Sequence, residues 1–142
     1  MARPLARARA SGQSPPVARF LYVCLAGAVG TGARYLLGGW VQRTWGAAFP
    51  YGTTIINLLG SFLIVVIMHL SLERGVIPAD LRVILTTGMM GGFTTYSSFN
   101  YESIRFLQQG AVGLAALNIG VTVAGCLLSG GLGLVCARAI AG

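Results

Sequence analysis

The sequence predicts an all-α integral membrane protein with four transmembrane helices, the third of them broken near Gly91–Thr95. Three observations lead to this prediction. Hydrophobic residues make up 55% of the 142-residue chain and charged residues only 9%, against roughly a quarter charged in soluble domains. Uncharged stretches long enough to cross a bilayer, roughly 20 residues, recur along the chain. The 21 glycines follow no collagen-like period and suit closely packed membrane helices.

The chain begins with an arginine-rich segment that contains no acidic residue and ends at Pro15-Pro16. We predict a disordered leader over residues 1–17 and one four-helix membrane domain over residues 18–140. A cleavable secretory signal is the alternative, with Ala26-Gly27-Ala28 as a cleavage-like site. The apolar run continues beyond that site to Val41, which favours a retained membrane helix.

The gaps between charged residues delimit the four helices. Each gap is long enough for a membrane span, and the connections between them are short and contain glycine or proline. The helices therefore alternate up and down across the bilayer. In chain order, the expected spans are Phe20–Val41, which is interrupted by Arg34, then Thr44–Leu72, Val83–Tyr101 and Phe106–Ala137.

All ten positive charges are arginines, and the formal net charge is +7. Most of them flank the apolar stretches, a pattern that orients membrane segments and argues against nucleic-acid binding. With both termini cytoplasmic, the chain without its first 16 residues places four arginines inside and two outside (Arg19, Arg74, Arg82 and Arg138 against Arg43 and Arg105). The three cysteines and one histidine offer no metal cluster or catalytic triad, so we predict that the protein is not an enzyme.

Arg34 lies inside the first apolar stretch. An arginine within a membrane span costs about 3 kcal/mol on insertion scales, so it normally faces protein or water and has a function. The alternative is a side chain that snorkels to the interface, which its distance of nine residues from Arg43 allows. A buried cation suits an anion pathway and opposes a cation pathway.

Two apolar segments carry a stripe of small polar residues at helical spacing. In the second segment the stripe comprises Thr53 or Thr54, Asn57 and Ser61, and in the fourth it comprises Asn118, Thr122 and Ser129. Such stripes either hold membrane helices together or line a pore, where amides and hydroxyls can solvate an anion. The presence of two stripes favours the pore.

The third segment contains Gly91-Gly92 followed by a run of hydroxyl residues, a composition that disfavours continuous helix. Unwound backbone at membrane depth is tolerated only where it is buried in protein or lines a cavity. A break here frees N–H groups, and it frees carbonyl oxygens that could ligate a hard cation such as sodium. Tyr96 and Phe99 would present electropositive ring edges to a small anion; packing is the alternative role for these rings.

Three stretches together resemble the signature segments of the CrcB/Fluc fluoride channels: Gly27–Tyr35, Gly52–Phe62 and Gly91–Phe99. The resemblance covers residues 20–138 in order and with matching spacing, and the third stretch is the most specific. It implies an antiparallel, dual-topology homodimer in the cell inner membrane with two pores, each built from both subunits. Such channels export fluoride passively and so reduce cytoplasmic fluoride toxicity.

The resemblance also implies roles for individual residues. The carbonyls of Gly91 and Thr94 match those that hold a structural sodium ion, which is not transported, on the dimer axis. Glu102 matches the acidic residue after the second aromatic and is a candidate gating group, and Arg34 is expected at the pore vestibule or in assembly. The expected fluoride pathway comprises Asn57, Tyr96, Ser97, Phe99 and Thr122, with Tyr96 standing where phenylalanine is usual.

Two other classes of function compete with the channel. A small multidrug-resistance-type transporter also has four helices, but it needs a membrane-embedded acid in its first helix, where this chain has Arg34 and neither Asp nor Glu. A non-transporting membrane assembly protein would account for the glycines and polar stripes. It would not account for the motif at the expected helix break.

Overall fold

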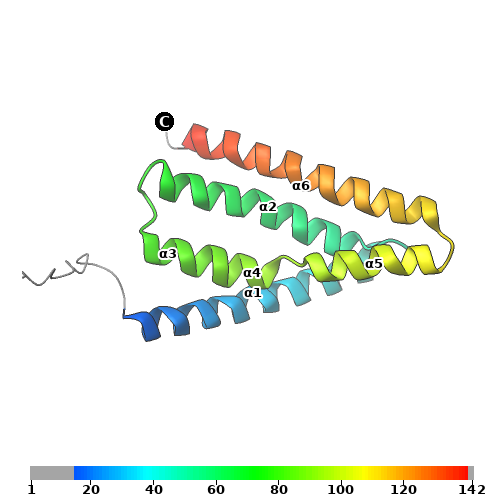
Figure 1. Ribbon diagram of the computed structural model, residues 1–142, viewed down its shortest axis with the longest axis horizontal. Helices are drawn as coiled ribbons and strands as arrows, with labels where there is room; N and C mark the ends of the chain where they lie inside the picture. The colour runs from blue at the N-terminus through cyan, green and yellow to red at the C-terminus, as the bar shows by residue number, and fades with distance from the viewer. Residues whose placement is uncertain (1–14, 141–142) are drawn as a thin grey trace, which may run out of the picture.

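The structure is a computed structural model in which residues 15–140 are described, and these residues contain helices and loops but no strand. Four segments, α3 to α5 with η1 between them, follow one another along a single line (Figure 1), and we call them together the third rod, residues 79–108. In chain order the elements are α1 (Pro16–Trp45), α2 (Tyr51–Leu72), α3 (Ala79–Val83), the π-helix η1 (Ile84–Met90), α4 (Gly91–Phe93), α5 (Tyr96–Gln108) and α6 (Val112–Ile140).

Three of these helices are long and apolar enough to cross a membrane: α1, α2 and α6, with 30, 22 and 29 residues. The third rod lies alongside them over a similar length (Figure 1), but its interruption leaves no single helix of that size within it. The arrangement therefore matches the expected set of four rods with a broken third member. The outward-facing side chains of these helices are largely exposed and apolar, as in a membrane protein.

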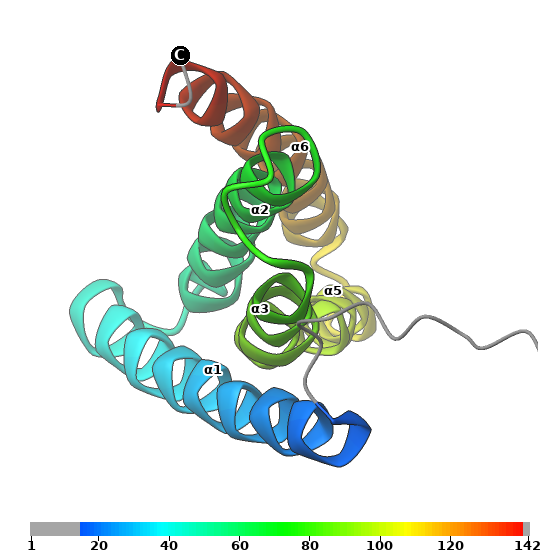
Figure 2. The ribbon, with the colours of Figure 1, turned by 90° about the vertical axis from the view of Figure 1, so that its left-hand side faces the viewer.

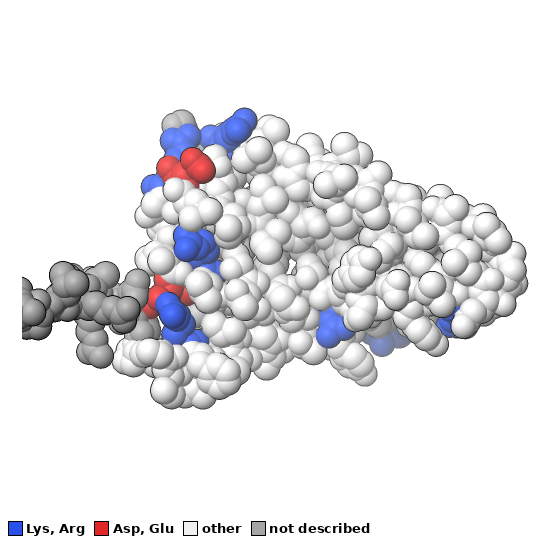
Figure 3. Space-filling view, viewed as in Figure 1, with Lys and Arg blue, Asp and Glu red and all other residues white. Residues whose placement is uncertain are grey.

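Short loops connect the rods, at residues 46–50, 73–78 and 109–111. Gly46, Gly75 and Gly110 adopt positive φ angles of 81°, 64° and 71° in these loops, a conformation that glycine adopts without steric cost. Because each loop reverses the chain, both ends of the described chain lie at the same end of the bundle (Figure 1). Arginine and acidic side chains are concentrated at this end (Figure 3).

The first helix is longer than expected. It begins at Pro16, whereas we expected the membrane domain to begin at residue 18. Proline is favoured at the first helical positions because its φ angle is already helical and its missing N–H would have no partner there. The rest of the expected leader, residues 1–14, lies outside the described residues.

Two helix pairings build the bundle. Helix α6 packs along α2, and α1 crosses the N-terminal half of the third rod (Figure 2). The second pairing is unusually close: a Cβ atom added at Gly30 would clash with the backbone carbonyl of Met89, and one added at Gly92 would clash with that of Gly27. Glycine therefore allows the two backbones to touch, as small residues do between membrane helices.

The break in the third rod lies at Thr94 and Thr95, within the expected region, but the two glycines do not form it. Gly91 has helical dihedral angles, φ −60° and ψ −38°, and Gly92 belongs to α4. Thr94 and Thr95 are extended, with φ/ψ of −76°/158° and −151°/102°. The expectation that Gly91-Gly92 disrupts the helix is wrong: both residues are helical, and the lack of a side chain at Gly92 allows close packing against α1.

Candidate functional site: the helix break

The break is organised by the side chain of Thr95, which caps α5. Its Oγ1 accepts a hydrogen bond from the backbone N–H of Ser98 at 3.2 Å and donates one to Ser98 Oγ at 2.9 Å. The same oxygen lies 3.3 Å from Ser97 Oγ. Threonine is a favoured N-cap residue because its hydroxyl satisfies an otherwise unpaired N–H of the first turn. Thr95 thus starts a new helix directly after the break.

Asn57, on α2, holds the extended backbone from the other side. Its Nδ2 donates to the carbonyl of Thr95 at 3.1 Å, and its Oδ1 accepts from the N–H of Thr95 at 2.8 Å. The amide is buried, with 8% of the residue exposed. It therefore satisfies both backbone groups of an extended residue, which would otherwise cost about 1–3 kcal/mol each if left buried and unpaired. Nδ2 keeps a second N–H that this pair of bonds does not use.

The break releases the two carbonyls expected to bind a cation. In a continuous α-helix, Gly91 O would accept from the N–H of Thr95 and Thr94 O from that of Ser98. Those N–H groups instead donate to Asn57 Oδ1 and Thr95 Oγ1. Both carbonyls are thus free of the helix ladder, and uncharged oxygens of this kind are suitable ligands for a hard cation. The chain supplies two such oxygens, and these are the two that fit the expected cation.

One of the two carbonyls between these positions, that of Gly92, is occupied. Gly92 O accepts a hydrogen bond from Arg34 Nε at 3.1 Å and one from Thr31 Oγ1 at 3.4 Å. Arg34 therefore reaches across from α1 to the last turn of α4 and does not snorkel along its own helix. It is partly buried.

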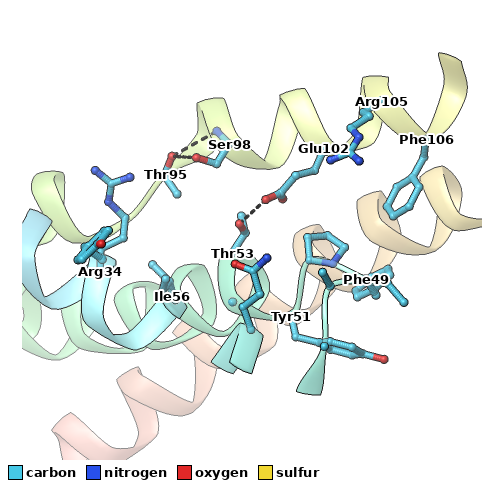
Figure 4. Close-up of a pocket in the computed structure, with 18 of the residues that line it drawn as sticks. Arg34, Phe49, Tyr51, Thr53, Ile56, Thr95, Ser98, Glu102, Arg105 and Phe106 are labelled. Atoms are coloured by element: carbon cyan, nitrogen blue, oxygen red, sulfur yellow. Dashed lines mark hydrogen bonds between the residues drawn. The ribbon is translucent and has the colours of Figure 1, made fainter. Parts of the chain in front are cut away.

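Beside the break, a cavity of about 620 Å³ opens between α1, the start of α2 and α5. Figure 4 shows Arg34, Thr95, Ser98 and Glu102 around it. The hydroxyl of Thr53 donates to Glu102 Oε1 at 2.6 Å. Two arginines, 34 and 105, and one glutamate line this cavity, which gives it a net positive formal charge. A half-enclosed space of this sign attracts anions.

The two aromatic side chains lie on the first turn of α5, with ring centroids 5.6 Å apart and planes tilted by 58°. Their surroundings differ sharply. Phe99 is only 7% exposed, whereas Tyr96 is 78% exposed on the outside of the subunit. Tyr96 therefore has little packing role within one subunit.

Thr122 lies on α6, one turn after Asn118, and both residues are buried. There Asn118 Nδ2 donates to Ser103 Oγ at 3.0 Å, and that hydroxyl donates to Phe99 O at 2.9 Å. Among the described residues, Asn118 Oδ1 and Thr122 Oγ1 have no hydrogen-bond partner. Farther along the stripe, Ser129 Oγ donates to Leu58 O at 2.7 Å, so this member holds α6 against α2.

Comparison with known sequences identifies the family of this chain. The sequence profile described as "CrcB-like protein, Camphor Resistance (CrcB)" matches residues 21–134, which include all the site residues above. The chain belongs to the CrcB family. This stretch begins in α1 and ends in α6, so the CrcB profile covers all four rods.

Similar CrcB-family proteins carry a functional name. The chain is 48% identical to a protein from Anaeromyxobacter sp. (strain K) over 89% of this chain and 100% of that protein. It is 47% identical to one from Sorangium cellulosum (strain So ce56), over 84% and 94%, and 43% identical to one from Citrifermentans bemidjiense, over 86% and 98%. Each is named "Fluoride-specific ion channel FluC".

Sequence reasoning did not single out two of the residues that build this CrcB-family site, and it missed the partner of a third. Thr95 organises the break, and Ser103 links Asn118 to the backbone of α5. Thr95 had a local signal, because threonine is a favoured helix N-cap residue. Ser103 depends on a partner 15 residues away, and Thr53, named in the polar stripe of the second segment, bonds Glu102, which is 49 residues away.

Proposed function

We propose that this protein is a fluoride channel that lets fluoride leave the cytoplasm passively across the inner membrane and so reduces its toxicity. Relatives that are 42–48% identical over most of the chain and are named fluoride-specific channels support this proposal. The observation that carries it is the break beside a positively charged cavity, where Asn57, Thr95 and Ser98 supply neutral hydrogen-bonding groups.

The chemistry of these groups suits a small, strongly hydrated anion. Such an ion gives up its water only where several donors replace it, and amide and hydroxyl donors do so without a fixed charge that would trap it. We place the spare N–H of Asn57, the hydroxyls of Ser97 and Thr122, and the ring edges of Tyr96 and Phe99 along the pathway. Arg34 and Arg105 would raise the anion concentration in the cavity. Glu102, held by Thr53, lies where it could control entry.

We further propose that two copies, antiparallel in the membrane, complete the pathway. Tyr96 and Gly91 are exposed on one subunit, where a partner would cover them. The arginines that flank the spans among the described residues divide four against two between the ends of the bundle: Arg19, Arg74, Arg82 and Arg138 against Arg43 and Arg105. A tag at the C-terminus should therefore be found on both sides of the membrane.

The first test is fluoride efflux from liposomes that contain only this protein, with chloride as the matched ion. A passive fluoride channel empties fluoride-loaded vesicles when a potassium ionophore balances the charge, and it retains chloride over the same period. Equal efflux of both halides would exclude fluoride specificity. Efflux that requires a proton gradient would exclude a channel.

A sodium ion held by the carbonyls of Gly91 and Thr94, doubled by the partner, is the proposed structural cofactor. When bound it supplies a positive charge that joins the two broken helices, and it is not transported. We predict that Gly91→Val damages dimer formation far more than Thr94→Ser, because a branched side chain crowds the approach at Gly91 whereas serine keeps the carbonyl in place. The measurement is the dimer fraction after purification in sodium and after assembly with sodium replaced throughout by a large organic cation. A full dimer yield without sodium would contradict the site.

A further inference from the structure

The short α4 ends inside the protein, and its last carbonyls lack their usual helical partners. Gly92 O would accept from the N–H of Tyr96 in a continuous helix, but the break at Thr94 and Thr95 removes this partner. Buried carbonyls at a helix C-terminus need another donor and favour a nearby positive charge. Arg34 supplies both through its Nε, 3.1 Å from Gly92 O.

One face of α1 carries the residues that bring Arg34 to this carbonyl. Gly27, Gly30, Thr31 and Arg34 lie at helical spacing of three and four and so share one face. The two glycines bring the backbone of α1 against η1 and α4, and Thr31 adds a second bond to the same oxygen at 3.4 Å. Close packing of α1 against α4 thus places Gly92 O within hydrogen-bond distance of Arg34 Nε.

We propose that Arg34 is a positioning residue that caps α4 and holds the shape of the break. By occupying Gly92 O, it fixes the last turn of α4, next to the free carbonyl of Gly91. The guanidinium lies at the edge of the cavity (Figure 4), and Arg34 lines that cavity. This inference concerns the shape of the break. Only a consequence of that shape for fluoride flux would rest on the proposed channel function.

Two substitutions separate this capping role from a purely electrostatic role. Arg34→Gln places an N–H donor the same number of bonds from Cα as Nε and removes the charge. Arg34→Lys keeps the charge but puts a methylene at that position and its donor one bond farther out. Arg34→Met removes both the donor and the charge at similar length. A capping role requires the donor at the Nε position, whereas an electrostatic role requires the charge.

The measurement is amide hydrogen exchange over residues 91–99 in the purified full-length protein. We expect Arg34→Met and Arg34→Lys to speed exchange at Thr94 and Thr95 roughly tenfold or more, as expected when a hydrogen bond to a charged group is lost and local opening becomes easier. Arg34→Gln should stay within about threefold of the parent, since it retains a donor there. Parent-like exchange in Arg34→Lys together with fast exchange in Arg34→Gln would overturn the proposal, as would equal exchange in all three variants.

Thr31→Val serves as a milder variant if Arg34→Met does not fold. It has nearly the same shape and removes only the longer bond to Gly92 O, so exchange should rise about twofold to threefold at the same two amides. A rise spread over the whole third rod would contradict local capping. The liposome experiment on the parent tests the channel function separately, because exchange at the break does not depend on which ion is conducted.

Discussion

Helix α6 packs on α2, and α4 packs on α1, through glycines that let the two backbones touch in each pair. Only the second pair includes a broken helix. In the first, a Cβ atom at Gly133 would lie 2.6 Å from Phe62 O, and Ser129 donates to Leu58 O at 2.7 Å. In the second, Gly92 packs against Gly27 in the same way. Glycine contacts and a polar residue are therefore a general means of assembly in this protein.

The two pairings differ in how the backbone N–H and carbonyl groups are hydrogen-bonded. Both α2 and α6 are continuous helices of 22 and 29 residues, whose internal carbonyls and N–H groups are paired within the helix. The third rod is interrupted, and side chains from its neighbours, Asn57 and Arg34, bond the freed groups. Close glycine contacts by themselves thus indicate only that two helices pack together. The site is distinguished by backbone groups that have left the helical hydrogen-bond pattern and bond to side chains instead.

The largest expected effect comes from separating α1 and the third rod. Gly30→Ala places a methyl group against the carbonyl of Met89, and such overpacking costs about 3 kcal/mol. We expect little folded protein and no fluoride efflux. Gly32→Ala is the matched control on the same helix, because nothing lies within 4 Å of its added Cβ. Size-exclusion chromatography in detergent compares the two, and a well-folded Gly30→Ala protein would contradict the described contact.

A smaller effect is expected inside the site, where ring edges are proposed to meet the ion. Phe99→Ile keeps much of the bulk of a side chain that is 7% exposed and removes its edge. Fluoride efflux should fall by roughly 100-fold, the loss seen when one preorganised group is withdrawn from a desolvated anion. Tyr96→Phe retains the edge and should lower efflux far less. If Phe99→Ile conducts as well as the parent protein, the two rings serve packing.

The smallest effect belongs to the α2–α6 pairing. Ser129→Ala removes one hydrogen bond to Leu58 O and should lower the free energy of unfolding by about 1 kcal/mol. Because this bond lies outside the break, fluoride efflux per folded protein should stay near the parent value. Thermal denaturation in detergent measures the first quantity. A large loss of flux at unchanged stability would place Ser129 in the pathway.

The fold was largely predictable from the sequence because a helix that crosses a bilayer must be a long, uncharged, apolar segment. The uncharged gaps located α2 and α6, although the expected spans, from Thr44 and Phe106, began several residues before the helices at Tyr51 and Val112. Glycine and proline marked the loops at Gly75 and Gly110. The exact position of the break was not predictable in this way. Gly91-Gly92 has low helix propensity, but both residues are helical, with Gly92 in close contact with α1, and the break falls on the threonines that follow.

The site was predictable in part, for a related reason. Asn57 and Arg34 stood out because a polar group in an apolar segment needs a partner, and both are found at the break. Their partners could not be read from the sequence, because they are backbone groups of Thr95 and Gly92, which become available only when the helix is interrupted. Thr122 matched a family position, and the structure places it one turn after Asn118 on α6, buried and without a hydrogen bond among the described residues.

Whether polar groups at the helix break carry the anion is tested by fluoride efflux from Asn57→Leu and Ser129→Ala, each normalised to its amount of folded protein. Both side chains bond backbone of a neighbouring helix rod, but only Asn57 lies at the break. We predict that Asn57→Leu lowers efflux by roughly 100-fold or more, as expected for the loss of a preorganised donor, and that Ser129→Ala conducts within about threefold of the parent, since it removes one neutral bond. Equal efflux from the two variants would contradict the claim.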